Sequence, residues 1–270
     1  MFDIYGKVAL VTGGASGLGL LYVKELLRHG IKGLCIADIN NAYGERAIED
    51  IKNEYGSEKA IFVTIDVADK YQLEEAFKST VQAFETLDIV INAADIFNDA
   101  IWEREVQTNI NGTINGTLLG FDYYLPTYKS GDEGIIVNFS SVTGLDPVAN
   151  SPVNVATKFA VLGLSRSFGL KLQYERHNVK VITICLGFTD PALADFVSNE
   201  RLLAPTYHEI LEKELDSIAV QPPIFVAKSV INILTEADAG SVWVVEGQQP
   251  PYEVEFLTRT QLKKKNIITK

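Results

Sequence analysis

The chain has 270 residues, of which 47% are hydrophobic and 22% charged, and its formal net charge is −11. That length suits one large α/β domain with a full core. The negative charge argues against nucleic acid or an anionic membrane surface as the main partner. The chain has no run of about 18 uncharged apolar residues, so we expect no membrane span.

Taken in chain order, short apolar runs alternate with stretches of helical periodicity. Apolar runs this long predict strands covered on both faces, and hence a parallel sheet. The expected strands span residues 7–12, 33–38, 60–66, 87–92, 134–140, 179–186 and 240–246. The expected helices span residues 18–29, 42–54, 71–84, 155–174 and 225–234, and Gly30 caps the first. This alternation predicts a doubly wound α/β fold with about seven parallel strands and helices on both faces.

Residues 192–223 interrupt the alternation, ahead of Pro222 and Pro223. No linker or repeat divides the chain, so we expect residues 1–270 to form one domain, with 192–223 as a lid over a ligand pocket. The first 12 residues lack the basic start and apolar middle of a signal peptide. Cys35 and Cys185 lie in strand-like apolar runs, which predicts buried thiols. These features together lead us to expect a cytoplasmic protein. We expect no metal site, because the three histidines lack the spacing of metal ligands.

A glycine-rich loop, TGGASGLG, follows the first strand at residues 12–19. Glycines there permit a tight turn and a close backbone approach, and the next helix offers unpaired N–H groups to a pyrophosphate. A merely structural turn is the alternative, but a position between strand and helix favours a nucleotide. The expected cofactor-binding residues of this loop are Thr12, Gly13, Gly17, Leu18 and Gly19.

Asp38 closes the second strand, 25 positions after Gly13 (38 − 13). A carboxylate there accepts hydrogen bonds from ribose hydroxyls and repels a 2′-phosphate, which predicts NAD rather than NADP. An aspartate that only caps the following loop is the alternative. Asp66 and Val67 end the third strand, where they are placed to contact adenine.

These motifs, with Asn109, Ser140-Ser141 and Lys158, resemble the short-chain dehydrogenase/reductase family over residues 5 to about 250. Within it the chain is most similar to the 15-hydroxyprostaglandin dehydrogenases and the insect-type alcohol dehydrogenases, through stretches such as GIIVNFSSVTGLDPVANSPV. The resemblance implies that Asn109 holds a proton-relay water, Ser141 binds the substrate oxygen and Lys158 binds the nicotinamide ribose. It also assigns Asn92 and Gly187 to the cofactor site.

The family's catalytic tyrosine lies 13 residues after the serine and four before the lysine. Both counts (141 + 13 and 158 − 4) end at Asn154. A lysine one helical turn away lowers the pKa of a phenol, which then exchanges a proton with an alcohol or ketone. An amide hydrogen-bonds but does not titrate usefully. Tyr207, in the expected lid, is the best candidate for a substitute phenol, with ordinary packing as its alternative role.

Further departures gather where nicotinamide and substrate would meet. The family's Asn-Asn-Ala-Gly is Asn92-Ala-Ala-Asp95, its Pro-Gly is Leu186-Gly187, and a frequent threonine is Pro191. Ser151 replaces a substrate-holding glutamine of the prostaglandin enzyme. Whether Asp95 faces the nicotinamide pocket or turns outward is open, and an inward Asp95 would weaken the expectation that a whole dinucleotide binds.

Three functions stay open at this point. The first is an NAD-binding protein with lost or strongly impaired catalysis, which holds an apolar, lipid-like ligand against Ser141, Ser151, Asn154, Phe188 and Tyr207. The second is an active NAD-dependent oxidoreductase of a lipid-like secondary alcohol or ketone. The third is a storage or structural protein on the same scaffold. The resemblance also implies a homodimer or homotetramer.

Overall fold

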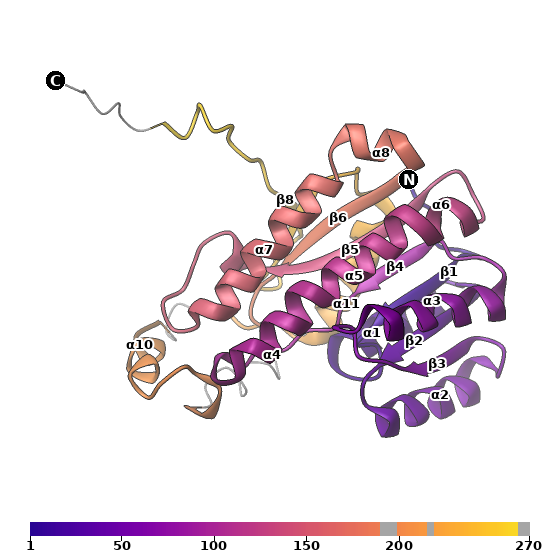
Figure 1. Cartoon of the computed structure of the whole chain (residues 1–270), viewed down its shortest axis with the longest axis horizontal. Coiled ribbons are helices and arrows are strands. Elements are labelled where there is room, and N and C mark those ends of the chain that lie inside the picture. Colours follow the sequence, from indigo (N-terminus) through magenta and orange to yellow (C-terminus); the bar gives the residue numbers. More distant parts are fainter. Residues whose placement is uncertain (190–198, 215–218, 264–270) are drawn as a thin grey trace.

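Residues 1–189, 199–214 and 219–263 are described by a computed structural model of the chain (Figure 1). Within them one sheet has the strand order β3-β2-β1-β4-β5-β6-β7-β8. The first seven strands pair in parallel, and β8 adds an antiparallel edge to β7. The expected doubly wound fold is confirmed. The strand β8 was not predicted, because a strand of two residues is too short to show an alternating pattern.

The strands agree closely with the apolar runs of the sequence. Every residue of β1, β2 and β4 is buried, which is why these strands lack polar alternation. The strands are β1 (Val8–Thr12), β2 (Gly33–Asp38), β3 (Ala60–Thr64), β4 (Ile89–Asn92), β5 (Gly134–Ser141), β6 (Val179–Leu186), β7 (Val242–Val245) and β8 (Tyr252–Glu253).

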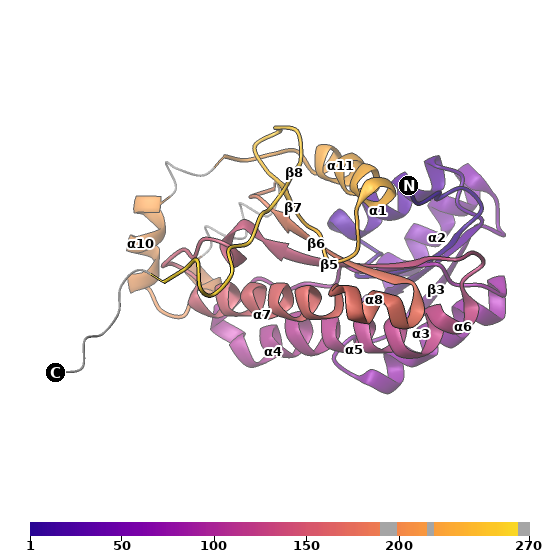
Figure 2. The same cartoon turned by 90° about the horizontal axis from the view of Figure 1, so that it is seen from above.

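Helices cover both faces of the sheet, as Figure 2 shows. One layer contains α1 (Gly17–Arg28), α2 (Asn41–Tyr55) and α11 (Pro223–Glu236). The other contains α3 (Lys70–Phe84), α4 (Trp102–Val106), α5 (Thr113–Leu118), α6 (Leu125–Tyr128), α7 (Pro152–Phe168) and α8 (Lys171–His177). The helix α10 (Thr206–Glu214) lies at one end of the molecule, beyond the sheet. Among the described residues, no helix is long and apolar enough to cross a bilayer.

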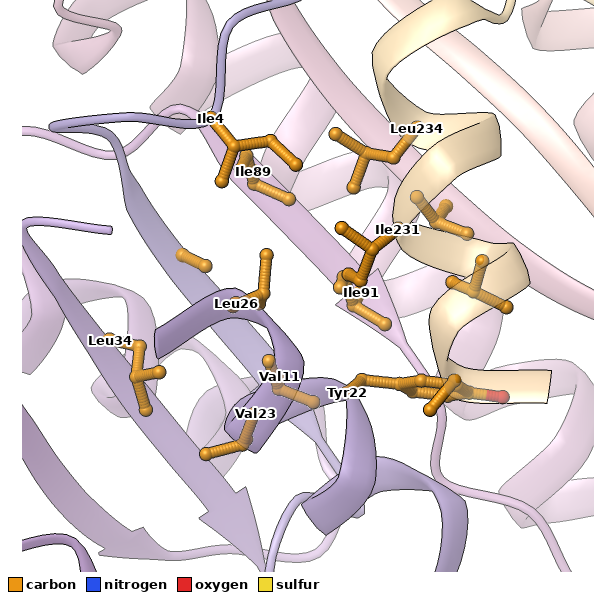
Figure 3. Close-up of a cluster of buried hydrophobic side chains, with 14 of the residues drawn as sticks. Ile4, Val11, Tyr22, Val23, Leu26, Leu34, Ile89, Ile91, Ile231 and Leu234 are labelled. Carbon is orange, nitrogen blue, oxygen red and sulfur yellow. The ribbon is translucent and has the colours of Figure 1, made fainter. Parts of the chain in front are cut away.

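The larger core cluster fills the space between the sheet and the layer of α1 and α11 (Figure 3). Side chains at helical spacing on α1 meet alternate residues of β1 and β4, and α11 closes the cluster from the far side. Its buried members include Val11, Tyr22, Val23, Leu26, Ile89, Ile91, Ile231 and Leu234.

Two helices differ from the sequence prediction. The helix expected over residues 155–174 ends at Phe168, and α8 begins at Lys171. The chain leaves the helical conformation at Leu170, which is extended (φ −60°, ψ 144°). The preceding Gly169 packs so closely on Gly240 that an added Cβ would overlap it. Residues 102–128 form one helical run in which two wider π-helical stretches, 107–112 and 119–124, separate α4, α5 and α6.

Candidate active site

The glycine loop joins β1 to α1 in the way the sequence predicts. Gly13 and Gly17 have φ values of +64° and +51°, which side chains other than glycine disfavour. A Cβ on Gly13 would lie 2.8 Å from the Cα of Ala94, and one on Gly19 would overlap the carbonyl oxygen of Gly13. The loop therefore needs glycine to pack against the end of β4.

A cavity of about 350 Å³, here called the nucleotide cleft, opens beside this loop at the carboxyl ends of the strands. Brought together in its lining are seven expected cofactor-binding residues: Gly13, Gly17, Leu18, Gly19, Asp38, Asp66 and Val67. Asp95 lines the same cleft. The cleft thus offers glycine backbone, a helix N-terminus and carboxylates, which suits an adenosine diphosphate group.

Asp38 also fixes the loop from the second strand. Its carboxylate accepts hydrogen bonds of 3.0 Å from the backbone N–H groups of Ala15 and Asn40. The side chain is therefore held at the edge of the cleft before any ligand arrives. A carboxylate in this place is what a ribose diol requires.

Asp66 forms an ion pair with Arg104, with 2.8 Å between its Oδ2 and the guanidinium Nη1. Partial burial raises the pKa of the Asp66 carboxyl, but hydrogen bonds from Arg104 and the backbone N–H of Ala68 outweigh burial and leave the pKa below its ordinary value. Arg104 lines the cleft as well. Arg104 was not among the residues predicted for the site, because an arginine on a helix is usually exposed to solvent.

Two other expected cofactor residues act from behind the cleft. The Thr12 hydroxyl accepts hydrogen bonds from the backbone N–H groups of Ala93 and Ala94, at 3.1 and 3.3 Å. The Asn92 amide turns away from the cleft and donates to Asn138 Oδ1 at 2.8 Å inside a buried polar network. Both residues hold the β4 end in place, and neither is among the residues that line the cleft.

Lys158 and Asp95 form an ion pair with 2.6 Å between Nζ and Oδ1. Lys158 is nearly buried, whereas the Asp95 side chain is 42% exposed and lines the nucleotide cleft. Asp95 therefore points into the cleft, and this finding counts against the expectation that a whole dinucleotide binds. The Lys158 ammonium, which would stabilise a phenolate at position 154, is instead paired with the Asp95 carboxylate.

Asn154 lies in the first turn of α7 and is nearly buried. Its side-chain Nδ2 donates to Glu105 Oε1 at 2.7 Å, and its backbone N–H donates to Asp99 Oδ1 at 2.9 Å. Glu105 and Asp99 are fully buried. The position that carries the family's phenol is therefore tied to a buried carboxyl on the neighbouring helix α4.

Burial raises the pKa of the Glu105 carboxyl to about 7, from an ordinary 4.5. The hydrogen bond from Asn154 acts in the opposite direction, and the negative charges of Asp99 and Asp95 add to the increase. The second oxygen of Glu105 has no hydrogen-bond partner in the described part of the chain. Glu105 and Asp99 had no signal in the sequence, because their burial follows from the packing of α4 on α7.

Asn109 and Ser141, the other expected catalytic residues, both bond to backbone. The Asn109 amide accepts from the N–H of Ile96 and donates to its carbonyl, both at 2.8 Å. The Ser141 hydroxyl accepts from the N–H of Thr143 at 3.1 Å. Asn109 therefore anchors the segment that carries Asp95.

A second cavity, of about 240 Å³, lies beside Val142, and of the five expected ligand residues only Phe188 lines it. Its lining combines apolar walls with two carboxylates: Val142, Val148, Gly187, Phe188, Glu214, Ala219 and Glu246. Ser151 is buried outside this lining. Tyr207 packs with Phe97 and Phe188 around Leu202 and Leu211. Pro191 and parts of the expected lid, 192–198 and 215–218, lie outside the described residues.

A parallel doubly wound sheet with a glycine-loop cleft at its carboxyl edge defines a dinucleotide-binding dehydrogenase scaffold. A sequence model of the short chain dehydrogenase family matches residues 7–201. The chain belongs to the short-chain dehydrogenase/reductase family.

The similar proteins include both branches expected from the sequence. The 15-hydroxyprostaglandin dehydrogenase [NAD(+)] of Mus musculus is 34% identical over 235 residues, which are 86% of this chain and 87% of that protein. Fat body protein 2 of Drosophila melanogaster is 28% identical over 246 residues, 91% and 94% of the two chains. Alcohol dehydrogenase 1 of Ceratitis cosyra is 27% identical over 243 residues, 90% and 92%.

Proposed function

We propose that this chain binds NAD in the nucleotide cleft and has lost efficient hydride transfer. NAD is the cofactor that the family and the relatives named for NAD(+) indicate. The glycine loop would hold its pyrophosphate, Asp38 its adenosine ribose, and Lys158 with Asp95 its nicotinamide ribose. When bound, the nicotinamide supplies a hydride acceptor or donor.

The observation that supports impaired chemistry is the environment of Asn154. Its amide donates to Glu105 and brings no proton to exchange with an alcohol or ketone. Lys158, the partner that would activate a phenol, is already paired with Asp95. Loss of a general acid or base typically lowers a rate by about 10²- to 10⁴-fold.

The second cavity supports an apolar ligand with a hydroxyl or carbonyl group. Val142, Val148 and Phe188 supply apolar walls, and Ser141, the residue before Val142, would hold the ligand oxygen. Glu214 and Glu246 make the cavity unfavourable for a carboxylate. Lipid-like alcohols and ketones therefore fit the proposal better than free fatty acids.

Glu105 favours a second candidate, an active NAD-dependent oxidoreductase of such an alcohol. It is a buried carboxyl beside position 154, and its pKa near 7 suits a group that exchanges protons at neutral pH. However, Glu105 is fully buried and lies behind the Asn154 amide, so we rank this function second.

The decisive test restores the family pattern. The double variant Asn154→Tyr/Asp95→Gly is expected to form reduced nicotinamide from NAD⁺ and an apolar secondary alcohol, at least about 10²-fold faster than the wild type. The matched control, Asn154→Phe/Asp95→Gly, adds the ring without the hydroxyl and is expected to stay inactive. Wild-type turnover that Lys158→Ala abolishes would contradict lost catalysis and favour the second candidate.

The quaternary state and compartment belong to the same proposal, a cytoplasmic homodimer or homotetramer. Trp102, Tyr123 and Phe159, on the α4–α6 run and on α7, are exposed in the single chain and would be covered in such an assembly. Native mass spectrometry of the purified protein measures subunit count, cofactor and ligand together. A monomer without bound nucleotide, and no thermal stabilisation by NAD⁺, would instead favour a structural or storage role.

A further inference from the structure

Three carboxyl groups gather near Lys158, which lies behind Asp95 and outside the lining of the nucleotide cleft. Asp95 contacts the Lys158 ammonium directly, and Asp99 and Glu105 are buried behind it, around Asn154. Of the other cations on these segments, Arg104 is paired with Asp66, and the Arg201 guanidinium donates to the Phe97 carbonyl at 3.3 Å. Asp95 is thus the carboxylate that contacts the Lys158 ammonium, with Asp99 and Glu105 grouped around Asn154.

Asp95 is held where it is by the residues on both sides of it. Thr12 binds the N–H groups of Ala93 and Ala94, and Asn109 binds both the N–H and the carbonyl of Ile96. These bonds fix the backbone on both sides of residue 95, and the 2.6 Å contact with Lys158 Nζ holds the carboxylate itself. It is thus a fixed charge of the site, and a cofactor must bind beside it.

We propose that Asp95 makes the cleft selective for oxidised over reduced NAD. This inference rests on the proposed function, in which the nicotinamide ribose binds at Lys158. The two forms of the cofactor differ in charge only at the nicotinamide ring, which is cationic in NAD⁺ and neutral in NADH. Lys158 alone would repel the cationic ring, whereas the Asp95 carboxylate neutralises the ammonium and attracts the cation.

This selectivity would make the bound fraction of the protein depend on the redox state of the cofactor. Its cofactor occupancy would follow the ratio of NAD⁺ to NADH, since it consumes neither. Asp95 is the specificity-determining residue in this account. Asn109 and Thr12 are positioning residues that hold its segment.

The test compares three ligands by isothermal titration calorimetry: NAD⁺, NADH and ADP-ribose, which lacks nicotinamide. The wild type is expected to bind NAD⁺ about tenfold more tightly than NADH, since one adjacent charge changes a charge-dependent equilibrium by about that factor. Asp95→Asn is expected to reduce this ratio about tenfold and to leave the affinity for ADP-ribose nearly unchanged. Glu103→Gln, which removes an exposed carboxylate from α4, is the matched control and is expected to keep the wild-type ratio.

The outcomes separate the two proposals. If ADP-ribose binds but NADH binds as tightly as NAD⁺ to the wild type, the selectivity is refuted while nucleotide binding stands, and this comparison needs no variant. An NAD⁺ to NADH ratio that Asp95→Asn does not change refutes the role of Asp95. Binding of ADP-ribose together with failure of both dinucleotides shows that Asp95 excludes nicotinamide. If none of the three ligands binds, the proposed function fails and the selectivity with it.

Discussion

Replacing Glu105 by glutamine is expected to flatten the pH dependence of the free energy of unfolding. Glu105 is fully buried, and its pKa is raised to about 7 in the folded chain from an ordinary 4.5. The folded state therefore holds the Glu105 proton more tightly than the unfolded chain does. The stabilisation is complete below the unfolded pKa and is lost as the pH rises through the folded pKa.

The size of the effect follows from the two pKa values. One pKa unit corresponds to about 1.4 kcal/mol. For a carboxyl with a pKa of 4.5 in the unfolded chain and about 7 in the folded chain, stability falls by about 2–3 kcal/mol between about pH 5 and about pH 8. Glutamine keeps an oxygen for the Asn154 amide and an N–H₂ group toward Asp99, and it does not titrate.

Urea unfolding followed by circular dichroism, at intervals across that pH range, measures the difference between wild type and Glu105→Gln. The wild type is expected to lose stability relative to the variant as the pH rises. Glu103→Gln, on the exposed side of the same helix, controls for the loss of a negative charge. A wild-type-minus-variant difference that stays constant, or that grows with pH in favour of the wild type, would refute the burial argument.

Three further substitutions test the fold and the cleft. Tyr22→Phe is expected to raise the free energy of unfolding by about 1 kcal/mol, because the buried Tyr22 hydroxyl has no hydrogen-bond partner among the described residues. A lower free energy of unfolding, measured with urea, would contradict this expectation. Gly19→Ala places a methyl group against the Gly13 carbonyl, and strain of about 1–3 kcal/mol should weaken NAD⁺ binding about tenfold or more, as measured by calorimetry. Asp88→Ala leaves the buried Val8 N–H and the Ser130 N–H and hydroxyl without their acceptor. It is expected to lower the free energy of unfolding by about 1–3 kcal/mol, and an unchanged urea midpoint would contradict this expectation.

Short-range patterns were sufficient to predict the fold. A strand buried on both faces must be apolar throughout, so β1, β2 and β4 are visible as continuous apolar runs. The glycine loop could also be predicted, because the positive φ values of Gly13 and Gly17 are a local restriction. The helix break at Leu170 could not be predicted, since no proline or periodicity change marks it and Gly169 packs on Gly240, far along the chain.

The candidate site divides in the same way. Counting from Ser141 and Lys158 located Asn154 at the tyrosine position, and the family's Asn-Asn-Ala-Gly pattern after the fourth strand located Asp95. The partners of these residues required the structure: Lys158 and Asp95 are 63 positions apart, and Asn154 and Glu105 are 49 apart. A charged residue on a helix reads as exposed from sequence alone.

The sequence by itself therefore determined the parallel sheet, the nucleotide-binding loop and the loss of a titrating group at position 154. Only the tertiary structure decided where the charges lie, namely Asp95 inward against Lys158 and Glu105 buried beneath Asn154. The physical reason is that periodicity and glycine conformation are properties of neighbouring residues. The direction, burial and pKa of a side chain depend on which helix packs against it.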